Sequence, residues 1–166
     1  MSFQYYKLRS EVKVAAADLL STAVPGQITS EGVKENVETC LAYTAAWVGG
    51  NGCIPLNYLM EDAATAEITR VQLWQWVHYA SRVSDTGEPI TAQYIDQIIS
   101  KTTKGGVKGR LGEIVKGLKE EDVKIAEEYL KGQIRKRWPS EFLTSDLMGY
   151  IAVRDGVEPA LQRAAL

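Results

Sequence analysis

The sequence predicts an all-α protein: a compact helical bundle that occupies residues 1–166 as a single domain. Three observations support this. Apolar residues recur at spacings of three and four, strand-like alternation is nearly absent, and Gly, Pro, Ser and Thr stand between the periodic segments. A chain of 166 residues with 45% hydrophobic composition can enclose one real core. We therefore expect roughly six to eight helices packed around a central pair.

The helical period covers six segments, which are residues 5–20, 33–48, 73–80, 94–99, 123–134 and 142–153. The first segment precedes Pro25 and Gly26, so residues 1–24 are expected to form an additional N-terminal helix. Thr29 or Ser30 can cap the second helix, since a hydroxyl there accepts from a free backbone N–H. The glycine-rich run 49–52 should end it, because glycine tolerates positive φ.

Further along the chain, Thr69 can cap the helix that carries Trp74, and Thr91 can open the next one. The single histidine, His78, is more typical of a helix surface or core than of a ligand. Residues 104–109 are basic and glycine-rich. No strand precedes them and the GxxxxGK[ST] pattern is missing, so a flexible connector is favoured over a phosphate cradle.

Charge and composition exclude several classes of protein. The net charge is −2 and the pI is near 5.5, which argues against nucleic acid as a partner. No apolar run is long enough for a membrane span and the N-terminus lacks a signal-peptide core, so we expect a cytoplasmic protein without membrane contact. Cys40 and Cys53 are interpreted as reduced thiols, because two cysteines form neither a disulfide framework nor a zinc site.

The least ordinary stretch is residues 51–69, where the adjacent acids Glu61 and Asp62 precede a run of small residues. Asp62 is well placed to cap the following helix by accepting from the amides of Ala64 or Thr65. A carboxylate fixed on a rigid loop is equally suited to act as a general base. Spacing alone does not separate the two roles.

A family resemblance is carried by the string Asn51-Gly52-Cys53-Ile54-Pro55-Leu56-Asn57-Tyr58-Leu59-Met60-Glu61-Asp62-Ala63-Ala64-Thr65-Ala66-Glu67-Ile68-Thr69-Arg70, followed by Gln72-Leu73-Trp74-Gln75-Trp76. This string resembles the signature of the shorter, A-type malate synthases almost residue for residue. The resemblance covers residues 28–150, most strongly in the first half, and it corresponds to the C-terminal helical domain of that family. It implies the same helical fold.

In that family an aspartate of the Met-Glu-Asp loop removes a methyl proton from acetyl-CoA, and the enolate attacks glyoxylate held on Mg²⁺. By position the resemblance assigns this catalytic role to Asp62, with Glu61 beside it. It also implies that Met60 lines the site and that Cys53 lies near the thioester arm. The intervening residues of this loop are expected to contact the substrate as well; they are Asn57, Tyr58 and Leu59.

The resemblance also implies that the Mg²⁺ ligands, an arginine and most CoA contacts come from an (α/β)₈ barrel, which needs about 200 to 250 residues. Only 27 residues precede the resemblance here. We therefore expect no cofactor in the isolated chain, and Mg²⁺ and acetyl-CoA only with a barrel partner. Expected partners are a small-molecule substrate and either a second copy of the chain or a barrel-type protein.

Three functions remain open. The first is a stand-alone acid/base catalyst that uses Asp62 on a reactive carbonyl or thioester-type small molecule, for enolisation, aldol or Claisen-type condensation, or cyclisation in a biosynthetic pathway. The second is a malate synthase fragment that makes malate only with a barrel in trans. The third is a non-catalytic binding domain.

Overall fold

The computed structural model describes residues 10–23 and 26–154, and in these the all-α prediction is confirmed. The elements in chain order are α1 (Ala16–Leu20), α2 (Ser30–Val48), β1 (Ile54–Leu56), β2 (Leu59–Glu61), α3 (Ala63–His78), α4 (Ala92–Thr103), the 3₁₀ turn η2 (Gly106–Lys108), α5 (Arg110–Ile114), α6 (Glu120–Gln133) and α7 (Leu143–Arg154). No helix in the described ranges is both long enough and apolar enough to cross a bilayer.

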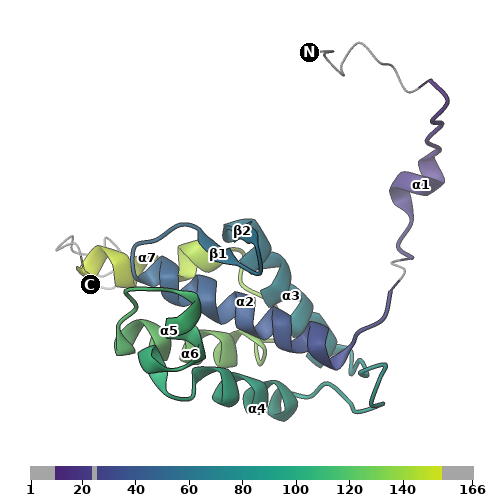
Figure 1. Cartoon of the computed structure of the whole chain (residues 1–166). Helices are drawn as coiled ribbons and strands as arrows, with labels where there is room; N and C mark the ends of the chain where they lie inside the picture. Colours follow the sequence, from purple (N-terminus) through teal and green to yellow (C-terminus); the bar gives the residue numbers. More distant parts are fainter. Residues whose placement is uncertain (1–9, 24–25, 155–166) are drawn as a thin grey trace, which may run out of the picture.

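Helix α2 lies at the centre of the molecule (Figure 1), and helices α3, α4, α5, α6 and α7 all contact it. It is buried on several faces because apolar and small residues surround it on nearly all sides. The helix begins where predicted, with Thr29 Oγ1 accepting from the Gly32 amide at 3.1 Å. It ends where predicted, at Gly49, followed by Gly50 with φ 91°. One central helix therefore takes the place of the expected central pair.

The sequence offered two caps for helix α3, Asp62 and Thr69, and the helix begins after the first of them. Its N-cap is Asp62, and Thr69 is buried inside the helix, where its hydroxyl donates to the Ala66 carbonyl at 3.0 Å. The prediction of Thr69 as a cap is therefore wrong. The small residues after Asp62 carry no apolar period, but alanine has the highest helix propensity, so the helix extends back to the first good cap.

A two-stranded antiparallel hairpin precedes α3, which the near absence of strand alternation did not predict. Ile54 pairs with Glu61 and Leu56 pairs with Leu59. The two residues between the strands, Asn57 and Tyr58, have φ 50° and 64°, the positive pair that a type I′ hairpin turn requires. Strands of three residues are too short to show a period of two in the sequence.

The glycine-rich segment 104–109 is ordered, and the expectation of a flexible connector is wrong. It contains η2, and the Val107 amide donates to Glu120 Oε1 at 3.3 Å. A Cβ at Gly109 would stand 2.1 Å from the Lys104 carbonyl oxygen, and one at Gly112 would stand 1.8 Å from the Val107 carbonyl oxygen. The glycines therefore permit close backbone packing between η2 and α5.

The N-terminal segment has less helix than predicted. Helix α1 covers only Ala16–Leu20, residues 10–15 are not helical, and residues 5–9 lie outside the described residues. Helix α1 buries none of its side chains, and Figure 1 shows it away from the bundle. Helical spacing gives little stability without a surface to pack against, so the periodicity of this segment does not produce a long helix.

A buried polar network fixes α3 against the chain between α6 and α7. Arg70, 1% exposed, donates from Nε and Nη2 to Glu67 Oε2 at 3.0 and 2.5 Å. Its Nη1 reaches Gln133 Oε1 at 3.1 Å and its Nη2 reaches the Ser140 carbonyl at 2.9 Å. The Leu143 amide donates to the second oxygen of Glu67. Because every member is paired, the network holds the start of α7 beside α3.

Candidate functional site

Asp62 lies at the junction between β2 and α3, with an exposed side chain. Its Oδ1 accepts from the amides of Ala64 at 2.9 Å and Thr65 at 3.3 Å, which is the predicted helix cap. Both bonds use the same oxygen, and Oδ2 has no hydrogen-bond partner in the part of the chain that the structure describes. Capping and proton transfer are therefore compatible in one carboxylate, since each can use its own oxygen.

The hairpin next to Asp62 presents apolar side chains to solvent. Tyr58 is fully exposed, and Leu59 and Met60 are 64% and 66% exposed. Half-buried Glu61 and exposed Cys53 lie at the open end of the hairpin, opposite its turn. The structure thus brings all seven sequence-predicted site residues to one hairpin and the cap that follows it, but it does not enclose them. Burial of this tip needs a surface from elsewhere.

Tyr43 of α2 lies beneath this loop and was missed by the sequence reasoning. It is buried, and its hydroxyl donates to the Gly52 carbonyl at 3.2 Å. Burial raises the pKa of Tyr43, and the charges of Asp62, Cys53 and Glu67 raise it further. The phenol therefore stays protonated near neutral pH. A tyrosine within an apolar helical period gives no sign that it supports a distant loop.

A cavity of about 370 Å³ adjoins the same loop. It is lined by Tyr43, Trp47, Gly50, Gly52, Thr144 and Ile151. A second cavity of about 270 Å³ lies under the hairpin turn, where Asn57 and Leu56 face Arg110 and Ile114 of α5. Asp62 is in the wall of neither cavity. Both cavities lie beside the hairpin.

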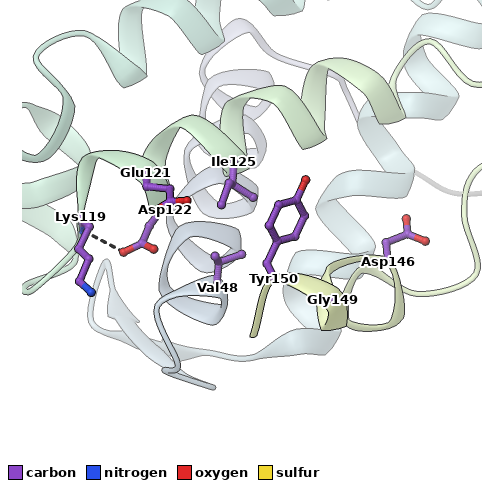
Figure 2. A pocket seen from close by; sticks show the side chains of 8 residues that line it. All are labelled: Val48, Lys119, Glu121, Asp122, Ile125, Asp146, Gly149 and Tyr150. Atoms are coloured by element: carbon purple, nitrogen blue, oxygen red, sulfur yellow. Dashed lines mark hydrogen bonds between the residues drawn. The ribbon is translucent and has the colours of Figure 1, made fainter. Parts of the chain in front are cut away.

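Another cavity, of about 550 Å³, is lined by none of the predicted site residues. Figure 2 shows it between the first turns of α6 and the C-terminal half of α7, with Tyr150 beside Ile125. Its buried acid, Asp122, accepts from the Lys119 amide at 2.8 Å, as the dashed line marks. That bond belongs to the cap of α6, so the most prominent acid of this cavity has a structural role.

The donors around Asp62 do not suit a magnesium ion. Within residues 10–23 and 26–154 no three His, Cys, Asp or Glu side chains are grouped to hold a metal. Both carboxylate oxygens of Glu67, the next acid along α3, already accept hydrogen bonds, one from Arg70 and the other from the Leu143 amide. His78 is exposed and stacks on Trp74 with ring centroids 4.6 Å apart, which agrees with the surface role expected for it.

Comparisons with known proteins identify a family. Residues 27–151 match the family described as "Malate synthase, C-terminal", close to the range 28–150 of the sequence resemblance. The glyoxysomal malate synthase of Candida tropicalis is 45% identical over 101 residues, which are 58% of this chain and 18% of that protein. A malate synthase of Myxococcus xanthus is 44% identical over 108 residues, covering 63% of this chain and 20% of that protein.

Malate synthase A of Escherichia coli is 39% identical over 106 residues, which are 64% of this chain and 20% of the relative. The chain therefore spans only 18–20% of the length of these curated relatives. Most of each relative has no counterpart in the 166 residues.

Proposed function

Because the chain belongs to the malate synthase C-terminal domain family, we propose that it supplies the general base of a malate synthase-type active site and that Asp62 is this base. The observation that carries the proposal is that Asp62 Oδ2 has no hydrogen-bond partner among residues 10–23 and 26–154, while Oδ1 of the same carboxylate is fixed by the helix cap. A base held this way is oriented before substrate arrives. Its task is to take a methyl proton from acetyl-CoA, so that the enolate attacks glyoxylate.

The described residues provide the base but not the rest of the site. A thioester methyl is a weak carbon acid, so its deprotonation needs a cation or strong hydrogen-bond donors at the developing enolate oxygen. Arg70, a neighbouring cation on α3, is already bonded to Glu67. We propose that the missing groups, Mg²⁺ ligands included, come from a barrel domain, in the same polypeptide or in a separate chain.

The hairpin suits the surface where such a barrel would close the site. Tyr58, Leu59 and Met60 form an exposed apolar tip beside Asp62. Covering these side chains would remove water from the carboxylate, which strengthens electrostatic interactions there. In this arrangement Met60 and Glu61 line the site, Cys53 lies toward the thioester, and Asn57 contacts substrate from the turn.

A second candidate is the stand-alone acid/base catalyst acting on a smaller, more reactive carbonyl compound. The cavity of about 370 Å³ beside the loop is large enough for a small substrate and has the protonated phenol of Tyr43 in its wall, but Asp62 does not line it, so this candidate has less support than the first. General acid–base help of roughly 10² to 10⁴ in rate is adequate for an already activated substrate. It is too little for acetyl-CoA without enolate stabilisation.

A chimera tests the first proposal. Residues 27–151 replace the C-terminal domain of the Escherichia coli relative, and CoA release is measured with acetyl-CoA, glyoxylate and Mg²⁺. We expect an active chimera, an inactive 166-residue chain, and a loss of at least about 10²-fold in kcat on Asp62→Asn in the chimera.

The control is Glu61→Gln, which neighbours Asp62 but leaves the cap intact and should lower kcat much less. A folded chimera that binds acetyl-CoA yet releases no CoA would count against the proposal. If the isolated chain instead turned over an activated dicarbonyl in an Asp62-dependent way, the stand-alone catalyst would be the better description.

A further inference from the structure

A cavity of about 490 Å³ lies among the first turns of α2, helix α4 and the start of α5, and none of the hairpin residues lines it. Its wall includes the apolar side chain of Ile98 and three basic residues, Lys34, Lys101 and Arg110. The malate synthase-type chemistry proposed above does not use these side chains. Acids in the same wall compensate some of these positive charges.

Two of the bases are paired with acids in the same wall. Arg110 donates from Nε to Glu38 Oε1 at 2.5 Å and from Nη2 to Oε2 at 3.2 Å, and Glu38 is buried. Lys34 Nζ lies 3.0 Å from Glu31 Oε1. These two pairs leave Lys101 as the surplus charge, since no acid lies within ion-pairing distance of it among the described residues.

Thr102, next to Lys101, contributes a hydroxyl to the cavity wall. Thr102 is 8% exposed and faces the cavity, and its Oγ1 makes no hydrogen bond within the described part of the chain. The hydroxyl of the adjacent Thr103, by contrast, donates to the Ile99 carbonyl of its own helix at 3.1 Å. No side-chain polar atom of the described residues is both fully buried and unpaired, so the Thr102 hydroxyl is open to solvent in the cavity and is available to a ligand that accepts from it.

Tyr94 adds a third donor. It lines the cavity, and its hydroxyl has no protein acceptor in the described residues. Burial raises the pKa of Tyr94, and Glu88 and Asp85 raise it further, so the phenol is protonated at neutral pH. Three donors, one of them charged, thus face a cavity whose acidic groups are already occupied by Arg110 and Lys34.

We propose that this cavity binds the oxyanion group, carboxylate or phosphate, of a small metabolite, with Lys101, Thr102 and Tyr94 as donors and Ile98 against its apolar part. Lys101 supplies the charge and Thr102 gives a directional bond. The proposal does not depend on Asp62, and it stands or falls independently of the malate synthase-type activity.

The test follows amide chemical shifts of the full chain during titration with inorganic phosphate and, separately, with butyrate, each against sodium chloride at equal ionic strength. We expect saturable shifts centred on Lys101 and Thr102 with at least one of the two anions. Saturable shifts with phosphate only would indicate a phosphate site, and saturable shifts with butyrate only would indicate a carboxylate site. Lys101→Gln should weaken binding about tenfold, the loss expected for a charge-assisted hydrogen bond.

The matched control is Lys104→Gln, which removes the same charge one turn further on but does not line the cavity. Thr102→Val separates a ligand contact from a structural one: it should weaken anion binding while the melting temperature without ligand stays equal or rises. The proposal is overturned if neither anion gives localised shifts, if Lys104→Gln weakens binding as much as Lys101→Gln, or if Thr102→Val leaves binding unchanged.

Discussion

Replacement of Asp62 separates its structural role from its chemical one. The cap consists of two backbone bonds to Oδ1, at 2.9 and 3.3 Å. Asparagine keeps a side-chain acceptor in that place and caps helices about as well as aspartate, whereas alanine removes it. The two variants should therefore differ in stability but not in the loss of the base.

The expected losses of stability follow from the energy of the helix cap. Asp62→Ala should lower the free energy of unfolding by about 1 kcal/mol, the usual cost of an N-cap. Asp62→Asn loses only the attraction between the carboxylate and the α3 dipole, about 0.3 kcal/mol for an exposed group. For a domain of this size the melting temperature should fall by about 3–6 °C with alanine and by about 1–2 °C with asparagine.

Calorimetry of the two variants and of Glu61→Gln measures these differences, and the chimeric enzyme measures the activity. The general-base reasoning requires that Asp62→Asn be nearly as stable as the original protein and yet inactive. It would be refuted by full activity in Asp62→Asn. Equal destabilisation by asparagine and alanine would refute the separation of the two oxygens.

Other consequences of the structure are open to simple measurements. Arg70→Met should destabilise the protein by about 2–3 kcal/mol in urea unfolding, because it leaves half-buried Glu67 without its cation and removes the bonds to Gln133 and Ser140; a cost below about 1 kcal/mol would mean that the network contributes little. Burial raises the pKa of the Cys40 thiol to about 12, so at pH 8 a thiol reagent should label only exposed Cys53 until denaturant is added. Rapid labelling of two thiols in the native protein would contradict this. Deletion of residues 1–23 should leave the melting temperature unchanged, since residues 10–23 bury no side chain; a clear fall would show that the segment packs on the bundle.

Local sequence determined the features that depend on neighbouring residues. Thr29, Asp62 and Thr91 all cap helices as their residue types predict, because a cap is a bond to an amide two or three residues away. The grouping of the seven predicted site residues also follows from chain continuity, since they span only Cys53 to Asp62. The family, too, was visible in the contiguous string around Asp62.

Tertiary structure decided what depends on distant partners. Periodicity over residues 5–20 predicted a long helix, but no packing surface stabilises it in the described part, and only Ala16–Leu20 is helical. Segment 104–109 resembled a flexible connector until Glu120 and close backbone contacts ordered it. The support of the loop by Tyr43 and the pairing of Arg70 with Ser140 depend on the distance and orientation of groups brought together by folding. Hydrogen bonds act over about 3 Å, and residue order does not specify which remote groups meet at that distance.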